Sequence, residues 1–243
     1  MSAPRSSGRS ETARASSAGD ALAHVDCWIF DLDNTLYPAS ADLFGPMRLR
    51  MRDYIADRLG CDRDEAHRLQ RQWYDDHGTT LAGLMAHHNV DPRHFLDNVH
   101  DIALDHLVAH DGLNAAIREL PGRKLIYTNA DVDYTRRVLA ALGLSDTFEQ
   151  VHDIHACAYR PKPDPWGYQL LCDSHNVEPT RAIFFEDLAR NLPPAKALGM
   201  ATVWIDDGSD PGGDRAAIDF ATPDLAAFLA TLIQELKPSC PSS

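Results

Sequence analysis

The chain has 243 residues, 44% hydrophobic and 24% charged, an ordinary balance for a soluble globular protein of one or two domains. Its formal net charge of −13 argues against a nucleic acid polymer as partner, because proteins that bind polyanions present basic patches. The five cysteines are dispersed without a CxxC and no apolar stretch approaches the roughly 18 residues of a membrane span, so we expect a cytoplasmic protein without a membrane partner.

The two ends of the chain are predicted to be tails. Residues 1–21 are rich in Ser, Ala and Arg and carry almost no large apolar side chains, so they cannot bury enough surface to become ordered. The segment also lacks the apolar region of a secretory signal. We therefore assign 1–21 as a disordered N-terminal tail and 238–243 as a C-terminal tail.

The first predicted strand ends at an acidic pair. The apolar run at 25–30 is too short for a helix and is typical of a strand buried on both faces of a parallel sheet. Asp31 follows directly and Asp33 stands two residues later, beyond the carboxyl end of the strand, where open sheets bind ligands. Two carboxylates that share a site raise one another's pKa, and a cation such as Mg²⁺ removes that cost.

Residues 39–111 show helical spacing and no strand signal. Apolar side chains recur every three or four residues between Leu43 and Leu59, and Gly60 follows as a stop. Asp62 with Glu65 forms a plausible cap for the next helix. Further helices are indicated at 66–73, 81–85 and 95–107.

From residue 111 onward, predicted helices and strands alternate, which is the pattern of an α/β sheet. The expected strands are 124–128, 148–151, 182–185 and 201–205, and the expected helices are 113–120, 131–142, 165–175, 188–198 and 225–236. We predict a doubly wound parallel α/β core domain, residues 22–38 and 112–237, with a helical cap domain inserted at 39–111.

The ends of the predicted strands, together with one loop, carry a set of polar residues that a parallel sheet would bring to one edge. They are Asp31, Asp33, Thr128, Asn129, Lys162, Glu186 and Asp187. Such a set suits phosphoryl transfer through an aspartyl-phosphate, because a carboxylate can act as the covalent nucleophile. A metal between Asp31 and Asp187 would neutralise the phosphoryl oxygens. Lys162 and the Thr128 hydroxyl would hold the remaining oxygens, and Asp33 would exchange protons with the leaving group and with water.

Four segments, FDLDNTLYP, LIYTNA, RPKPDP and FFEDLARN, resemble in order and spacing the four motifs of haloacid dehalogenase (HAD) superfamily phosphohydrolases. The resemblance implies that Asp31 is the nucleophile and Asp33 the general acid/base. It implies that Thr128 and Lys162 stabilise the phosphate, with Asn129 beside them as a phosphate-binding residue.

The same resemblance implies a Mg²⁺ cofactor. Its ligands would be the carboxylates of Asp31 and Asp187 and the backbone carbonyl of Asp33. Glu186 and Asn191 match accessory positions of the metal site. The insertion at 39–111 corresponds to the cap called C1 in this superfamily.

Within the insertion and the last motif, the segments LYP, WYDDHGTTLAGL and FFEDLARNL resemble the pyrimidine 5′-nucleotidase branch. This resemblance implies that the partner is a small phosphorylated metabolite, a pyrimidine nucleoside 5′-monophosphate, with His77 in contact with it. The sequence leaves open whether the protein is a monomer or a homodimer.

Several alternatives remain beside this interpretation. A related phosphatase could act on a sugar phosphate, phosphoglycolate or pyridoxal phosphate, and a protein of the same fold could bind or regulate without turnover. A dehalogenase of the superfamily uses no metal and would have no use for Asp33 and the acidic pair at 186–187. A phosphonatase would need a Schiff-base lysine in the cap, and 39–111 contains no Lys.

Overall fold

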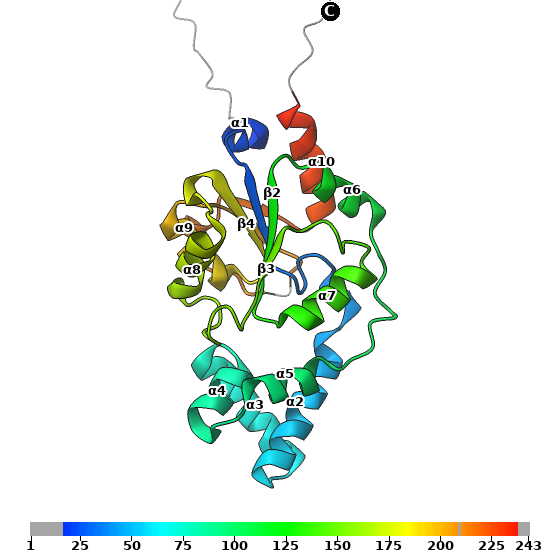
Figure 1. Cartoon of the computed structure of the whole chain (residues 1–243), viewed down its shortest axis with the longest axis vertical. Coiled ribbons are helices and arrows are strands. Elements are labelled where there is room, and N and C mark those ends of the chain that lie inside the picture. The colour runs from blue at the N-terminus through cyan, green and yellow to red at the C-terminus, as the bar shows by residue number, and fades with distance from the viewer. Residues whose placement is uncertain (1–16, 209, 238–243) are drawn as a thin grey trace, which may run out of the picture.

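The computed structural model describes residues 17–208 and 210–237, and within these residues six strands form one parallel sheet (Figure 1). The strand order is β3-β2-β1-β4-β5-β6. The strands are β1 (Cys27–Phe30), β2 (Arg123–Tyr127), β3 (Gln150–His152), β4 (Ala182–Glu186), β5 (Ala201–Ile205) and β6 (Phe220–Thr222). The order reverses between β1 and β4, and the carboxyl ends of these two strands form the crevice in which such sheets bind ligands.

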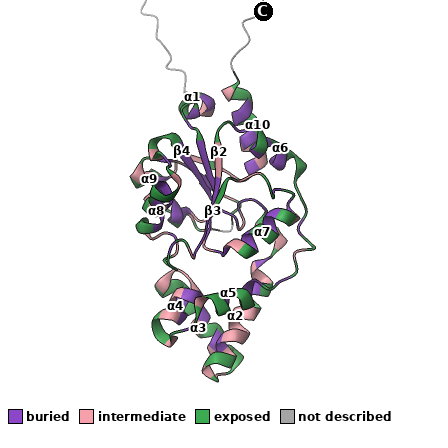
Figure 2. Cartoon of the chain, viewed as in Figure 1, coloured by how far each residue is buried: buried purple, intermediate pink, exposed green. Residues whose placement is uncertain are grey.

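Helices cover both faces of the sheet, because the apolar side chains of its central strand, β1, point to both sides and must be buried on both. All four residues of β1 are buried (Figure 2), with Trp28 and Phe30 in one apolar cluster and Cys27 and Ile29 in the other. The first cluster includes α6 (Asp111–Glu119), α7 (Val132–Ala141) and α10 (Leu225–Leu236), and the second includes α8 (Pro165–His175) and α9 (Leu192–Leu198). The predicted doubly wound α/β fold is confirmed.

Four further helices form a helical lobe between β1 and α6 in the chain. They are α2 (Phe44–Leu59), α3 (Arg63–His77), α4 (Thr80–His88) and α5 (Pro92–His100), and they lie at the end of the molecule opposite α1 and α10 (Figure 1). Local signals set their ends: Gly60 closes α2 with a left-handed φ of 64°, and the Asp62 carboxylate accepts from the Glu65 N–H at 2.8 Å. In the part of the chain that the structure describes, every helix falls short of the length and apolar character that a membrane crossing requires.

The helix expected at 95–107 ends at His100, so this prediction was wrong over its second half. The carbonyl oxygens of His100 and Ile102 accept hydrogen bonds from the Arg137 guanidinium at 2.9 and 2.5 Å. Because a residue of α7 satisfies these carbonyls, they do not need the hydrogen bonds of a continued helix. The helix therefore ends at His100, although apolar residues continue at helical spacing beyond it.

Among the α-helices and strands of the described residues, one short helix and one short strand were not predicted. The helix α1 (Ala18–Leu22) takes in the last four residues of the segment assigned to the N-terminal tail, where Gly19 donates to Glu235 of α10 at 2.7 Å, and ends at the buried Leu22. The edge strand β6 is three residues long, too short for an alternation pattern to show. The rest of the tail prediction, 1–16 and 238–243, lies outside the described residues.

Candidate active site

Asp31 lies one residue beyond β1, in the crevice between β1 and β4. Its backbone N–H donates to the carbonyl of Phe185 at 2.9 Å, which continues the ladder of the sheet and fixes the backbone at this point. Its carboxylate accepts a hydrogen bond of 2.7 Å from the ammonium group of Lys162. That ammonium also donates to Glu186 at 2.6 Å and to the carbonyl of Tyr127 at 3.1 Å. All three protons of the ammonium are therefore engaged, and the Lys162 side chain is only 2% exposed.

Lys162 belongs to a loop that is held by the segment after β2. The Asn129 side chain accepts from the Lys162 N–H at 2.8 Å and donates to the Lys162 carbonyl at 3.4 Å. Thr128 is buried, lines the same cavity as Lys162, and its hydroxyl accepts from the Ala130 N–H at 3.0 Å. The Asn129 amide thus positions the Lys162 loop, a task that the sequence did not indicate.

Three carboxylates gather at the ends of β1 and β4. Ligand atoms of Asp31, Glu186 and Asp187 lie within 4.8 Å of one another, and all three residues are buried. Burial, together with the Glu186 charge, raises the pKa of Asp31 to about 8 and that of Asp187 to about 10. Burial acts to lower the pKa of Lys162, but the Asp31 and Glu186 carboxylates outweigh it and raise that pKa, so the ammonium stays charged.

The acidic cluster fits a divalent cation. One ammonium faces three carboxylates, and the Glu186 oxygens are already bonded to Lys162 and to the Leu188 N–H at 3.2 Å. Asp31 and Asp187 are the carboxylates with lone pairs left for an ion, Asp187 Oδ2 also accepting from the Asn34 amide at 3.3 Å, and hard oxygen donors of this kind are the ligands that Mg²⁺ prefers. Asn191 is buried beside the same cavity, with its amide oxygen unpartnered among the described residues.

Mg²⁺ should stabilise the protein against heat, and more strongly near pH 8 than near pH 5. Without metal the folded protein holds Asp31 and Asp187 protonated up to about pH 8 and 10, whereas the unfolded chain releases these protons near pH 4. The free energy of unfolding therefore falls as pH rises through this window, and a bound cation offsets the loss by stabilising the ionised carboxylates. Thermal melts with and without Mg²⁺ at both pH values test this. An equal rise in Tm at both, or in Asp187→Asn, would contradict it.

Asp33 occupies a different environment from Asp31. Its Oδ1 accepts hydrogen bonds from the hydroxyls of Tyr37 and Tyr134, the latter at 2.9 Å. Burial raises the pKa of Asp33, and the two hydroxyls act against that rise. Its Oδ2 has no hydrogen-bond partner among the described residues, and Asp33 lines the cavity. A carboxyl group held at one oxygen and open at the other suits proton exchange with a ligand.

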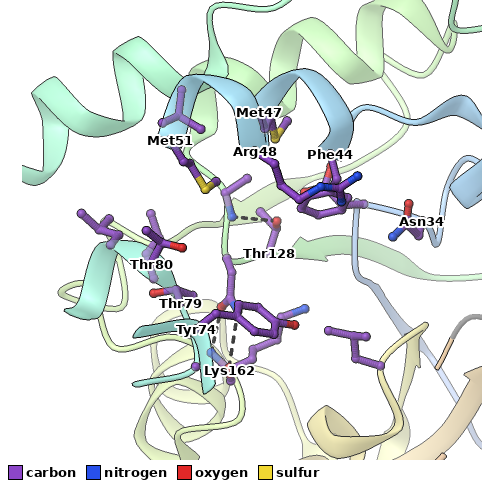
Figure 3. A pocket seen from close by; sticks show the side chains of 18 of the residues that line it. Asn34, Phe44, Met47, Arg48, Met51, Tyr74, Thr79, Thr80, Thr128 and Lys162 are labelled. Carbon is purple, nitrogen blue, oxygen red and sulfur yellow. Dashed lines mark hydrogen bonds between the residues drawn. The ribbon is translucent and has the colours of Figure 1, made fainter. Parts of the chain in front are cut away.

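A cavity of about 550 Å³ lies between the strand ends and the helical lobe. Figure 3 shows Phe44, Met47, Arg48 and Met51 of α2 on the side opposite Lys162. The lobe also contributes apolar side chains of α5 and polar side chains of α3, so the wall facing the polar cluster combines apolar residues of α2 and α5 with polar residues such as Gln70 and Arg71. The volume is typical of sites for small ligands.

The structure does not bring His77 to this cavity. Its Nε2 lies 3.1 Å from the Nε2 of His87, and the residue is not among those lining the cavity. Tyr74, nearly one helical turn earlier, lines it instead and joins the lobe to the core. The Arg190 guanidinium donates to the Tyr74 hydroxyl at 2.6 Å and lies 4.7 Å from the centre of its ring.

The site contains residues that sequence reasoning did not single out. Tyr37 stands within the LYP segment, but nothing in the sequence connected it to Asp33. Tyr134 reaches Asp33 from α7 across 101 residues of chain, and no local pattern marks it. Such contacts depend on how α7 packs, which only the tertiary structure shows.

Comparison with known proteins gives a family match over most of the chain. A sequence model for haloacid dehalogenase-like hydrolases matches residues 25–199. Phosphate metabolism protein 8 of Saccharomyces cerevisiae is 28% identical over 196 residues, 72% of this chain and 60% of the yeast protein. Validoxylamine A 7′-phosphate phosphatase of Streptomyces hygroscopicus subsp. limoneus is 33% identical over 104 residues, 40% of this chain and 47% of that protein. The chain thus spans 60% and 47% of the length of these two relatives.

Solved structures share the fold. A HAD phosphatase from Thermococcus onnurineus matches with a TM-score of 0.60 at 20% identity, over 86% of this chain and 98% of that one. An L-2-haloacid dehalogenase from Xanthobacter autotrophicus matches with a TM-score of 0.54 at 17% identity, over the same shares of the two chains. One architecture therefore serves phosphatases and dehalogenases, and the choice between these chemistries depends on the site.

Proposed function

The chain belongs to the haloacid dehalogenase-like hydrolase family, and from this premise we propose that it is a Mg²⁺-dependent phosphomonoester hydrolase acting through an aspartyl-phosphate on Asp31. The observation that carries the proposal is the buried group at the crevice, where Asp31 lies 2.7 Å from the Lys162 ammonium and within the carboxylate cluster of Asp187. The name of the Streptomyces relative, a phosphatase, supports the same reaction class.

In the proposed reaction, a carboxylate oxygen of Asp31 attacks the phosphorus atom and the bond to the leaving oxygen breaks. The Thr128 hydroxyl would hold a phosphoryl oxygen as charge develops on it, and Lys162 would do the same by exchanging its hydrogen bond to Asp31 for one to a phosphoryl oxygen. Asp33 donates its proton to the leaving alkoxide and then takes a proton from the water that hydrolyses the aspartyl-phosphate. The products are an alcohol and inorganic phosphate, and both carboxyl groups return to their initial states.

The carboxylates of Asp31 and Asp187 and the backbone carbonyl of Asp33 would hold the Mg²⁺. When bound, the ion supplies positive charge that neutralises the phosphoryl oxygens and orients them for in-line attack. Asp31 must be ionised to attack, and a neighbouring cation favours that form over the protonated one.

Two features favour a phosphatase over a dehalogenase. Asp33 is held by two tyrosine hydroxyls with one oxygen open, which suits a proton donor to a leaving alkoxide. Asp187 adds a second carboxylate, whose ligand atom lies within 4.8 Å of that of Asp31. A metal-free displacement of halide needs neither group.

We propose a pyrimidine nucleoside 5′-monophosphate as the substrate, with the helical lobe acting as a cap over residues 22–38 and 112–237. The apolar side chains of α2 and α5 in the cavity wall offer a surface on which a base could lie. The contact between Tyr74 and Arg190 would hold the cap against the core and keep bulk water out during reaction.

A panel of phosphate esters tests this proposal. We expect Mg²⁺-dependent release of phosphate, with kcat/KM for UMP and CMP at least about tenfold above that for AMP, a difference of about 1.4 kcal/mol in transition-state binding. The panel should include a sugar phosphate, pyridoxal phosphate, phosphoglycolate and p-nitrophenyl phosphate, with phosphate release as the readout.

Two outcomes would count against the proposal at different levels. Equal rates on purine and pyrimidine nucleotides would remove the nucleotide preference and leave a phosphatase for another small metabolite. Absence of Mg²⁺-dependent release from every ester, including the aryl phosphate, would favour a binding or regulatory protein of the same fold.

A further inference from the structure

His100 is a buried histidine that lines the cavity and has no part in the reaction described above. It is the last residue of α5, is 8% exposed, and its Nδ1 bonds to the Asp131 carboxylate. Asp131 caps α7 by accepting from the Tyr134 N–H at 2.8 Å. Burial is the largest single influence and acts to raise the pKa of Asp131, but the interactions with His100 and the hydrogen bonds from the backbone N–H groups of Asp133 and Tyr134 together lower that pKa, so the carboxylate is charged and Nδ1 is the donor.

The opposite edge of the ring is open to the cavity. Among the described residues Nε2 of His100 has no hydrogen-bond partner. It is also not among the fully buried polar atoms that lack a partner, so its surface is not completely covered by protein. The remainder of the side chain is buried against Asp131 and Tyr134. Since the residue lines the cavity, Nε2 is the ring atom that a ligand in the cavity can reach.

The ring also lies beside the proposed acid/base. The His100 imidazole stacks on the Tyr134 ring at 4.5 Å between centroids and 20° between planes. The Tyr134 hydroxyl in turn donates to Asp33 at 2.9 Å. His100 and Asp33 therefore flank the same tyrosine and line the same cavity, so a leaving group that receives its proton from Asp33 can extend toward His100.

The backbone at His100 does not depend on its imidazole. The carbonyls of His100 and Ile102 are held by Arg137. The charged carboxylate of Asp131 thus keeps the buried His100 ring in a fixed orientation and leaves one ring nitrogen for a ligand. Binding residues are usually preorganised in this way.

We propose that His100 is a specificity-determining residue whose Nε2 hydrogen-bonds a hydroxyl group on the leaving group, two or three carbons from the ester oxygen. A hydroxyl matches the site because it can donate to a neutral Nε2 or accept from a protonated one. The inference rests on the proposed phosphatase function, and it names the substrate class as esters of polyhydroxylated alcohols, of which a nucleoside 5′-monophosphate is one.

Two small esters isolate this contact. Glycerol 3-phosphate and propyl phosphate have the same carbon chain and differ in the hydroxyl groups. We expect the full-length wild type to prefer glycerol 3-phosphate by about tenfold in kcat/KM, an effect of the size expected for one hydrogen bond. In His100→Asn, whose amide can replace Nδ1 toward Asp131 but ends short of Nε2, the preference should fall to about one through a higher KM, with propyl phosphate hydrolysed as before.

A second variant and a control complete the experiment. His100→Gln carries an amide nitrogen near the position of Nε2 and should keep part of the preference, and it serves in place of His100→Asn if that variant does not fold. His94→Asn changes a histidine of the same helix that bonds to Tyr54 away from the cavity, and it should leave both rates unchanged. Equal loss on both esters in the His100 variants would overturn the inference. Failure of the wild type to release phosphate from both esters and from p-nitrophenyl phosphate would instead contradict the phosphatase proposal.

Discussion

Replacing Asp31 with Asn should abolish phosphate release while the protein keeps its fold. Asn has nearly the same shape but is a poor nucleophile, so the covalent step is lost and kcat should fall by at least about 10⁴-fold. The fold should tolerate the change because burial penalises the charged form of Asp31, whose pKa is raised to about 8. Lys162 would retain its ion pair with Glu186 at 2.6 Å. Turnover of p-nitrophenyl phosphate and thermal melts measure the two effects.

The matched control for this variant is Asp26→Asn. Asp26 precedes β1 and pairs at the surface with Arg181 at 2.7 Å, with about half of each side chain exposed. Its replacement should leave turnover unchanged and shift stability by less than about 1 kcal/mol. Residual activity of Asp31→Asn above a few per cent, with this control intact, would exclude an aspartyl-phosphate at position 31.

Replacing Lys162 with Met should both inactivate and destabilise the protein. The ammonium is the shared partner of Asp31 and Glu186, and all three side chains are less than a tenth exposed. Removing one member of a buried ion pair leaves the other charges uncompensated, which typically costs about 3–5 kcal/mol. The carbonyl of Tyr127 also loses its donor. Urea unfolding at pH 7 measures the loss of stability, and phosphate release measures the loss of activity.

The loss in Lys162→Met should depend on pH with a defined sign. In the variant, the folded protein can relieve the uncompensated charge only by binding protons, so the destabilisation should be smaller near pH 5 than near pH 8. Lys196→Met is the control, since Lys196 pairs with Asp219 at 2.5 Å at a partly exposed site. Such pairs contribute about 0–1 kcal/mol. Equal destabilisation by the two substitutions would show that the buried ammonium does not hold the cluster together.

Much of the fold follows from local patterns in the chain. The apolar run of β1 and the alternation of helices and strands after residue 111 predict a parallel sheet covered on both faces, and the structure has that sheet. Elements with clear local ends match closely: α8, β5 and α10 begin and end where the sequence indicated. These elements have a capping Asp, a preceding Gly or a following Pro that act within a few residues.

The predictions failed where a distant contact overrides local preference. Helical spacing continues beyond His100, yet Arg137 takes the carbonyls there and the helix ends. His77 lies within the segment that resembles a nucleotidase cap, yet its ring pairs with His87. Neither partner is marked by the residues nearby in the sequence.

The motifs in the sequence are enough to indicate the reaction class that we propose, because they set the residue types at the ends of the parallel strands. The tertiary structure alone decided how each polar group is held: Lys162 between Asp31 and Glu186, Asn129 on the Lys162 loop, and two tyrosines on Asp33. The physical reason is the range of a hydrogen bond. Asp31 and Lys162 are 131 residues apart in the chain and 2.7 Å apart in space. Local propensity carries no information about which atoms the packing of separate elements brings within that distance.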